Sequence, residues 1–454
     1  MLTYELKKAP GVPLYEALYR CIRSDILEGI LKPGEQLPSK RALAVNLEVS
    51  KITVETAYSQ LLSEGYIRSR EKVGYFVESA ARTPAPAAEQ SRESEPEQPP
   101  AIDLTANGSA KFPFSVWIRL QREVVLDYGE KLLLPLPNRG DPALRQAIAD
   151  HLAGFRGMRV SPENILIGAG TDFLYNLLIQ LLGRDQVYAV EEPGYDKIRR
   201  IYAAGGVRVV SAPLDGQGVR PDALQDAQVL HISPAHHFPT GLVTTADRRL
   251  ALLRWAGDSK WIIEDDYDSE FRFDSHPIPT LQSLDRADRV IYMNTFSKSL
   301  APSIRISYMV LPGALMDQFQ RRLGFYSCTV PSFEQLTLAR FISRGHFEKH
   351  INRLRKFYRA RRNQVVALLD GCRHRDRLTI LEQDAGLHFL LRLNTQLDDE
   401  SLVRRCAEEG IRLRALSSYY HGPVPEEDRH CLVVNYSGMD DQALEILQKK
   451  LTQP

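Results

Sequence analysis

The chain has 454 residues, of which 43% are hydrophobic and 25% are charged, and its formal net charge is +1. This length predicts two or three domains, and bulk charge gives no reason to expect nucleic acid, a membrane or an acidic ligand. The scattered cysteines show no CxxC spacing, which argues against a zinc site or a disulfide framework. No apolar run approaches the roughly 18 residues of a membrane span, and the N-terminus lacks a signal-peptide core. We therefore expect a cytoplasmic protein with no metal site and no membrane contact.

The N-terminal module predicts three helices and a hairpin. Apolar residues recur at helical spacing over 14–29, a short helix over 40–47 follows Ser39 as its cap, and a third helix begins after Ser50. The run 65–77 then predicts two short strands. A short helix, a tight turn and a second capped helix form a helix-turn-helix, with the basic hairpin as its wing. Periodicity alone also allows a small helical docking domain with solvated charges.

Four motifs of this module match one known family. The turn GILKPG, the helix start LPSKR, the core TVETAY and the wing from EGYI to GYFV resemble the GntR winged helix-turn-helix. Lys51 departs from the arginine usual in that family, which keeps the charge but loses the bidentate fork. The resemblance implies binding to double-stranded operator DNA. The residues that it implies as DNA contacts are Ser39, Lys40, Arg41, Lys51, Thr53, Arg70 and Gly74.

Residues 80–101 form the clearest boundary in the chain. They are rich in Pro, Ala, Glu and Ser and lack large apolar side chains, so they cannot build a core. We expect a partly extended tether there. It separates a DNA-binding domain over 1–79 from an effector domain over 102–454.

The larger module predicts an α/β fold. Short β-branched strands alternate with helices from about residue 140, which indicates a mostly parallel sheet covered by helices on both faces. The segments GAG, PGY, HHFPTG, EDDYDSEF and TFSK each follow a strand. Ligands of such sheets bind beyond the carboxyl ends of the strands, so we expect these segments to converge on one site. A helical stretch from about residue 312 leads to a smaller C-terminal α+β portion.

Lys298 and Asp265 carry the clearest chemistry in this module. Lys298 lies in a hydroxyl-rich turn that Arg305 follows, and Asp265 ends an apolar strand upstream. A lysine that forms an imine with an aldehyde cofactor needs an acid for a pyridine nitrogen and an arginine for a phosphate. Taken alone, GAG also fits a simple turn, the carboxylates Asp265, Asp266 and Asp268 fit a solvated loop or a metal cluster, and Lys298 fits a surface lysine. In their order and spacing they resemble fold-type I, pyridoxal-phosphate-dependent aminotransferases over 102–454, and with the GntR module the chain resembles the MocR/GabR class of regulators.

The resemblance implies a pyridoxal 5'-phosphate site and a role for each matching residue. Lys298 would form the Schiff base, Asp265 would pair with the pyridine nitrogen, and Tyr267 could hydrogen-bond the ring hydroxyl. Tyr195 would stack on the ring. The residues implied for the phosphate are Gly170 and Thr171 at a helix start, with Thr295, Ser297 and Arg305.

Departures from the aminotransferase pattern bear on the ligand. Phe238 replaces the asparagine of NPTG, which leaves His236 or His237 to take over its contact, and Asp172 stands where an amide or neutral residue is frequent. The stretch LLPLPNRG lacks the tyrosine that family members often send to the neighbouring subunit's phosphate. Val433 stands where the arginine for an amino-acid carboxylate is expected. The arginines that could compensate are Arg412, Arg414 and Arg429.

We therefore expect a pyridoxal-phosphate-dependent transcription regulator that senses an amino compound through an external aldimine at Lys298. The resemblance also implies a homodimer whose two helix-turn-helix modules read two half-sites. The alternative is an active aminotransferase that carries a DNA-binding module. Val433 argues against efficient turnover, and the sequence leaves enzymatic activity open. A sensor of the cofactor itself, without an amine effector, is a third class.

Overall fold

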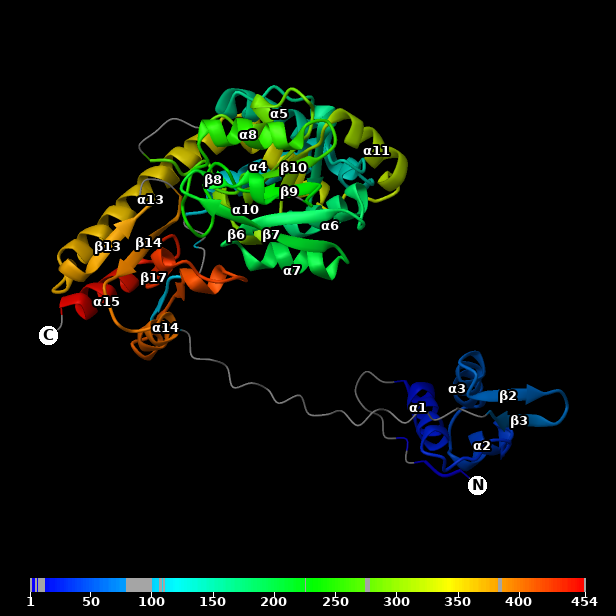
Figure 1. Cartoon of the computed structure of the whole chain (residues 1–454). Helices are drawn as coiled ribbons and strands as arrows, with labels where there is room; N and C mark the ends of the chain where they lie inside the picture. The colour runs from blue at the N-terminus through cyan, green and yellow to red at the C-terminus, as the bar shows by residue number, and fades with distance from the viewer. Residues whose placement is uncertain are drawn as a thin grey trace. The chain divides into compact units, whose positions relative to one another are not determined.

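The chain divides into two compact units, Met1–Gln98 and Pro99–Pro454, which we describe separately (Figure 1). The expected tether over 80–101 lies outside the described residues except for its last two. Among the described residues, no helix is long and apolar enough to cross a membrane. The computed structural model describes residues 2–4, 6, 13–78, 100–105, 108, 111–224, 226–273, 278–382 and 386–452.

The N-terminal unit packs three helices against a small antiparallel sheet. Its helices begin at the residues expected from their spacing and caps: α1 (Leu14–Leu27), α2 (Lys40–Asn46) and α3 (Lys51–Ser63). The strands are β1 (Gln36–Leu37), β2 (Ile67–Arg70) and β3 (Gly74–Val77), in the order β1-β3-β2. The sequence pattern predicts only a turn where β1 lies. Leu37 is buried there and Gln36 pairs with Phe76, so the wing has a third strand.

The second unit contains a large, mostly parallel sheet. Its order is β5-β12-β11-β10-β9-β6-β7-β8; β12 runs antiparallel to both of its neighbours, and β8 runs antiparallel to β7. The sequence pattern does not separate β12 from the lysine turn before it. The strands are β5 (Ile165–Gly168), β6 (Val187–Glu192), β7 (Arg208–Asp215), β8 (Gly218–Val219), β9 (Val229–Ile232), β10 (Trp261–Asp265), β11 (Val290–Thr295) and β12 (Ser307–Val310).

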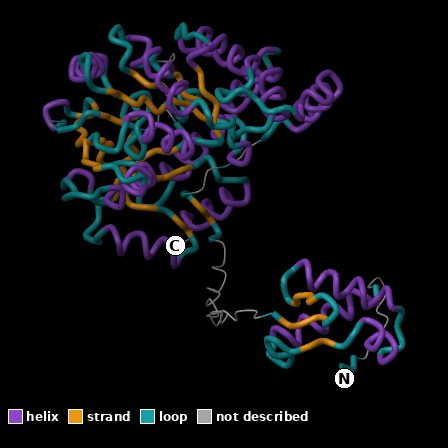
Figure 2. Tube along the Cα trace, turned by 90° about the vertical axis from the view of Figure 1, so that its right-hand side faces the viewer, coloured by secondary structure: helices purple, strands orange, loops and turns teal. Residues whose placement is uncertain are grey.

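Helices cover both faces of this sheet (Figure 2). Ile165 and Ile167 of β5 belong to one core cluster, whereas Leu166 belongs to the cluster on the opposite face. Both faces are therefore buried, as the sequence predicts. The helices are α4 (Phe114–Tyr128), α5 (Pro142–Arg156), α6 (Thr171–Leu182), α7 (Asp196–Ala204), α8 (Ala246–Ala256), α9 (Leu281–Leu284), α10 (Phe296–Ser299), α11 (Gly313–Leu323) and α12 (Ser332–Ser343).

The C-terminal portion is α+β, as expected. The long α13 (His346–Asp370) leads into an antiparallel sheet of order β13-β14-β17-β16, and β15 pairs in parallel with β4 from the start of the unit. This portion also contributes side chains to the cavity described next. Its remaining elements are β4 (Ile102–Asp103), β13 (Leu378–Leu381), β14 (His388–Leu393), α14 (Asp399–Glu408), β15 (Ile411–Arg412), β16 (Arg414–Ala415), β17 (Cys431–Asn435) and α15 (Asp441–Thr452).

Candidate functional site

A cavity of about 420 Å³ lies where β6, β9, β10 and β11 end. The sequence predicts this convergence, because the carboxyl ends of parallel strands meet at one edge of a sheet. The C-terminal portion closes part of the wall with Arg414, Tyr419, His421 and Asn435. All but one of the residues predicted for a cofactor line it, namely Thr171, Tyr195, Asp265, Tyr267, Thr295, Ser297, Lys298 and Arg305.

Lys298 enters the cavity from α10, directly after the buried strand β11. Thr295 caps α10, because its Oγ1 accepts the Ser297 N–H at 3.2 Å and so turns the chain where the strand ends. Burial lowers the pKa of Lys298 to about 8, although the Asp268 carboxylate acts in the opposite direction. The neutral, nucleophilic amine is therefore far more populated at neutral pH than in an ordinary lysine.

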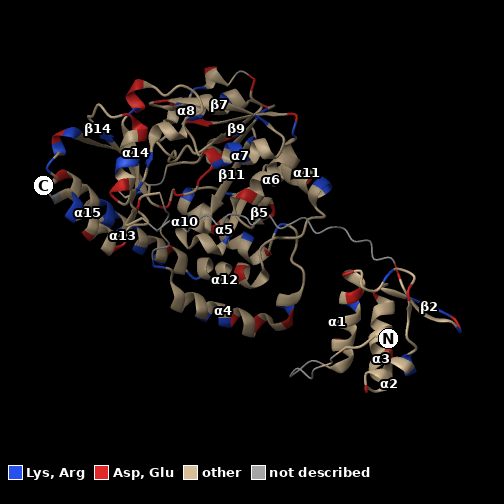
Figure 3. Cartoon of the chain, turned by 90° about the horizontal axis from the view of Figure 1, so that it is seen from below, with Lys and Arg blue, Asp and Glu red and all other residues tan. Residues whose placement is uncertain are grey.

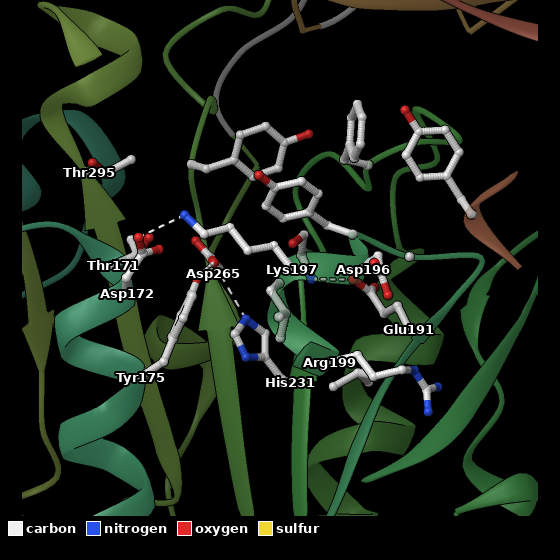
Figure 4. Close-up of a pocket in the computed structure, with 18 of the residues that line it drawn as sticks. Thr171, Asp172, Tyr175, Glu191, Asp196, Lys197, Arg199, His231, Asp265 and Thr295 are labelled. Atoms are coloured by element: carbon white, nitrogen blue, oxygen red, sulfur yellow. Dashed lines mark hydrogen bonds and ion pairs between the residues drawn. The ribbon is translucent and has the colours of Figure 1, made fainter. Parts of the chain in front are cut away.

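Asp265 is the last residue of β10 and is held by two neighbours. The Tyr175 hydroxyl donates a hydrogen bond to its Oδ2 at 2.5 Å, and His231 Nε2 lies 3.4 Å from the same oxygen (Figure 4). Tyr202 in turn contacts His231 Nδ1 at 2.6 Å. The other oxygen, Oδ1, is buried and has no hydrogen-bond partner within the described residues. The carboxylate is thus fixed in orientation and keeps one acceptor for a donor outside the chain.

The start of α6 and Arg305 form one corner of the cavity. Arg305 Nη2 lies 3.4 Å from the Ala169 carbonyl oxygen and 3.6 Å from Asp172 Oδ2. Gly170, the predicted residue that does not line the cavity, caps α6 with a φ of +89°. A helix start with an arginine beside it favours an anion, because backbone N–H groups and a guanidinium face the same space.

The two predicted tyrosines lie in different surroundings. Tyr195 precedes α7, is 51% exposed, and meets Phe238 edge to face with ring centroids 5.9 Å apart. Tyr267 is partly buried, and its hydroxyl lies 3.4 Å from His236 Nδ1. That histidine nitrogen also lies 2.8 Å from Asp268 Oδ2. The exposed face of Tyr195 is therefore open to a stacking partner, whereas Tyr267 belongs to a buried polar group.

The structure shows which of the histidines and arginines proposed to replace missing aminotransferase residues line the cavity. His236 and His237 are engaged by Asp268 and Thr240 and do not line the cavity. Among the three arginines, only one lines it. Arg412 lies 3.5 Å from Asp103 and Arg429 lies 3.0 Å from Glu426, both away from the cavity lining, whereas Arg414 contributes to its wall.

Several cavity residues were not predicted from the sequence. Tyr175 lies one helical turn after Thr171, so its spacing could have indicated it. His231 lies on a strand read only as apolar. The sequence named Arg414 only as one of three candidate arginines, because it lies on a two-residue strand whose partner no local pattern reveals. Glu191 also lines the cavity, and burial raises the pKa of its carboxyl to about 8.

The helix-turn-helix residues lie at the starts of α2 and α3. Ser39 and Ser50 cap these helices by accepting the N–H groups of Ala42 and Thr53, both at 3.1 Å. The Thr53 hydroxyl lies 2.8 Å from Ser50 Oγ and thus takes part in the cap. Two of the predicted contacts, Ser39 and Thr53, therefore already have a structural task in stabilising the helix starts.

The basic side chains at these helix starts differ in whether they form an ion pair. Lys40 forms an ion pair with Glu55 at 2.7 Å, whereas Arg41 and Lys51 are exposed. Beside Lys51 the side chain of Ile52 is 74% exposed, a feature that sequence patterning missed. An exposed apolar side chain at the start of a recognition helix can contact a thymine methyl group.

The wing carries the remaining predicted contacts. The Arg70 guanidinium lies 5.0 Å from the centre of the Phe76 ring. Gly74 has a φ of +138°, and a Cβ there would lie 2.9 Å from Gln36 Nε2, so it serves the close approach of β1 and β3. Figure 3 shows basic residues on α2 and along the β2–β3 hairpin. Within the described ranges, no group of three or more His, Cys, Asp or Glu residues is arranged to hold a metal ion.

Comparisons with known proteins agree with this architecture. Residues 99–451 match the family model of class I and II aminotransferases, and residues 14–77 match that of the gntR family of bacterial regulatory proteins. The kynurenine aminotransferase of Pyrococcus horikoshii superposes with a TM-score of 0.67 at 25% identity, covering 77% of this chain and 89% of that one. An α-aminoadipate aminotransferase of Thermus thermophilus gives 0.66 at 24% identity, covering 77% and 92%. The second unit therefore has the aminotransferase fold, which implies dependence on pyridoxal 5'-phosphate.

Relatives over nearly the whole length are regulators. An uncharacterized HTH-type transcriptional regulator of Bacillus subtilis, YdeL, is 37% identical over 93% of this chain and 93% of its own. The probable rhizopine catabolism regulatory protein MocR of Rhizobium meliloti is 34% identical over 97% and 93%. The pyridoxine biosynthesis regulator PdxR of Corynebacterium glutamicum is 33% identical over 93% and 92%. The chain belongs to the MocR/GabR class of transcription regulators, in which a GntR-type helix-turn-helix is joined to an aminotransferase-like domain.

Proposed function

We propose that this regulator holds pyridoxal 5'-phosphate at Lys298 and senses a small amino compound there, and that operator DNA is bound by the N-terminal unit. The observation that carries this proposal is the Oδ1 of Asp265, which is buried and has no hydrogen-bond partner among the residues that the structure describes, in the cavity that Lys298 also lines. A protonated ring nitrogen would supply the donor which that oxygen lacks. Without such a donor, a buried carboxylate oxygen costs free energy.

The other residues of the cavity fit the same cofactor. The start of α6, Thr295, Ser297 and Arg305 supply donors suited to a phosphate, and Tyr195 offers an aromatic face. When bound, the cofactor supplies an aldehyde carbon that reacts reversibly with primary amines. Lys298 contributes a neutral amine at near-neutral pH, because burial lowers its pKa to about 8.

We expect amine binding to change the conformation of the protein through contacts between the sheet and the C-terminal portion. The backbone N–H groups of His421 and Gly422 donate to the Glu192 carboxylate of β6 at 3.1 and 2.6 Å. The Gly194 N–H donates to the Tyr419 carbonyl oxygen at 3.1 Å. A ligand that contacts both walls of the cavity therefore acts on the segment that joins the sheet to this portion. Ligand binding shifts the population only if the contacts differ between two arrangements.

The expected partner chain is a second copy of this protein. α4 buries Trp117, Leu120 and Val124 against the core, yet Ile118 is 61% and Leu126 is 72% exposed. The segment that follows adds further exposed apolar side chains at Leu133 and Leu134. Exposed apolar residues gathered on one helix and the segment after it are typical of a subunit interface, and they support the proposed homodimer.

Borohydride reduction tests the cofactor assignment. Reduction of the loaded full-length protein, followed by peptide mapping, should place the cofactor on Lys298, and the Lys298→Ala variant should fold but retain no covalent label. Titration with primary amines should then change the absorbance of the bound cofactor. Label on another lysine contradicts the assignment, and an absorbance that no amine changes contradicts the sensing of an amino compound.

A further inference from the structure

Arg414 differs from the other arginines of the cavity in its partners. Arg199 lies 3.4 Å from the Glu192 carboxylate and donates to Ser211 Oγ at 2.7 Å, and Arg305 lies 3.6 Å from Asp172. Arg414 instead lies beside the Tyr419 hydroxyl, and within the described residues it has no carboxylate within ion-pair distance. Arg414 lines the cavity and is exposed, so its guanidinium is accessible to an anion that enters from solution.

Strand pairing determines where the Arg414 side chain projects. β16 runs antiparallel to β17, and Arg414 is paired directly with Val433. Directly paired residues project from the same face of a sheet. Val433 is buried on that face in a cluster with Tyr419 and Phe238, two residues that also line the cavity. Arg414 thus projects on the cavity side. It lies directly across from Val433, the position where the aminotransferase pattern would have its arginine.

We infer that Arg414 binds an anionic group of the effector, which is then a small molecule with both a primary amine and a carboxylate. This inference rests on the proposed function, because the amine end is taken to react at the Lys298 end of the same cavity. A guanidinium can hold a carboxylate through two parallel hydrogen bonds, a geometry that an ammonium group cannot offer.

Tyr419 adds a donor beside the guanidinium. Burial raises the pKa of the Tyr419 hydroxyl, and the Arg414 guanidinium lowers it only in part, so the hydroxyl keeps its proton at neutral pH. An anion bound between the two side chains would accept hydrogen bonds from both. Because Arg414 and Tyr419 belong to the C-terminal portion, the carboxylate would be held by one wall of the cavity and the amine by the other.

A matched series of ligands tests this assignment. The full-length protein loaded with pyridoxal phosphate is titrated with ω-amino carboxylates from glycine to 6-aminohexanoate. Each is compared with the unbranched amine of the same chain length, and with aminosulfonates and aminophosphonates as other anions. The absorbance of the bound cofactor gives the dissociation constant. At least one carboxylate should bind about 10- to 100-fold more tightly than its matched amine, as expected for hydrogen bonds to a charged group.

Variants of Arg414 separate charge recognition from structure. Arg414→Gln should remove this 10- to 100-fold preference and leave the dissociation constants of the plain amines unchanged, and Arg414→Lys should restore it only in part. Arg412→Gln, on the preceding strand β15 and outside the cavity lining, should change neither the preference nor the dissociation constants of the plain amines. Should Arg414→Gln fail to fold, Arg414→Lys alone decides, because a full carboxylate preference in that variant contradicts bidentate binding.

The outcomes distinguish this inference from the function on which it rests. A wild-type protein that responds to amines but shows no preference for any carboxylate contradicts the role of Arg414 alone. The same holds if Arg414→Gln weakens carboxylates and plain amines equally, or if only sulfonates or phosphonates are preferred. A wild-type protein that responds to no amine contradicts both proposals.

Discussion

The guanidinium of Arg305 fills the space into which a side chain at Gly170 would project. A Cβ at Gly170 would lie 2.1 Å from Arg305 Nη2, so the glycine lets the arginine lie against the start of α6. Gly170 also has a φ of +89° and a ψ of 163°, a conformation that is essentially restricted to glycine. The close approach and the backbone conformation can be separated, because Gly183 at the other end of α6 has a similar φ and ψ but ample space.

Gly170→Ala should therefore weaken phosphate-dependent cofactor binding by displacing Arg305, whereas Gly183→Ala should not. Both variants should lose about 1–3 kcal/mol of unfolding free energy, since both force alanine into a conformation that only glycine adopts readily. Fluorescence titration with pyridoxal phosphate measures the first effect and urea unfolding the second. Equal cofactor affinity in the two variants would contradict the proposed phosphate contact at the start of α6 and Arg305.

Cofactor loading should show the lowered pKa of Lys298. The neutral amine attacks the aldehyde, so the loading rate of cofactor-free protein should rise with pH up to about 8 and then level off. A lysine with its ordinary pKa of 10.5 would keep accelerating, and at pH 7 it would have roughly 300-fold less neutral amine. Stopped-flow absorbance between pH 6.5 and 10 measures the profile. Lys298→Ala, which lacks the amine, corrects for reaction at other lysines.

Tyr175→Phe should destabilise the second unit by about 1.5–3 kcal/mol, because it removes a hydrogen bond to a buried carboxylate. Tyr188→Phe is the matched control. That tyrosine is also a buried residue, but its hydroxyl donates over 3.4 Å to a neutral carbonyl oxygen in a part-buried bond, so the loss should be about 0.5–1 kcal/mol. Urea unfolding of the full chain, followed by far-UV circular dichroism, compares the two. Equal losses would mean that Tyr175 does no more for Asp265 than an ordinary buried tyrosine.

The double variant Arg41→Ala with Lys51→Ala should bind operator DNA more weakly and reduce the slope of log K against log salt by about 2, one for each lost phosphate contact. Lys40 is a poorer target, because Glu55 already pairs with it. Fluorescence anisotropy on a duplex selected from a random pool measures both quantities. Arg20→Ala, an exposed arginine of α1, is the control. An unchanged slope in the double variant would contradict phosphate contacts at the two helix starts.

Ile118→Glu with Leu126→Glu should dissociate the proposed homodimer, because each change places a charge in a surface that association would bury. We expect the dimer dissociation constant to rise at least about 100-fold. Sedimentation velocity over a range of concentrations measures it. Leu250→Glu alters an apolar side chain of α8 that is 44% exposed, and it should have no effect. A wild-type protein that sediments as a monomer would refute the dimer itself.

Local patterns were sufficient for the helices of the N-terminal unit and for most of the large sheet. Ser39 and Ser50 act through bonds to residues three positions away, and caps of this kind depend on neighbours in the chain. The strand β1 was not predicted, because two residues are too few to show a periodic pattern. Phe76, with which Gln36 pairs, also lies far along the chain. β12 escaped for a related reason, since its antiparallel direction depends on pairing with β5 and β11.

The amino-acid sequence alone leads to the class of protein, because the order of two motif sets along the chain requires no coordinates. It also indicates Lys298 and Asp265, since Asp265 ends one apolar strand and Lys298 lies in the polar turn that follows another. Only the tertiary structure shows that Arg414, of the three candidate arginines, lines the cavity. Only it shows that Tyr175 and His231 contact the Asp265 carboxylate. These contacts join residues far apart in the chain. Strand register and side-chain packing of the whole unit decide them, and no local pattern encodes either.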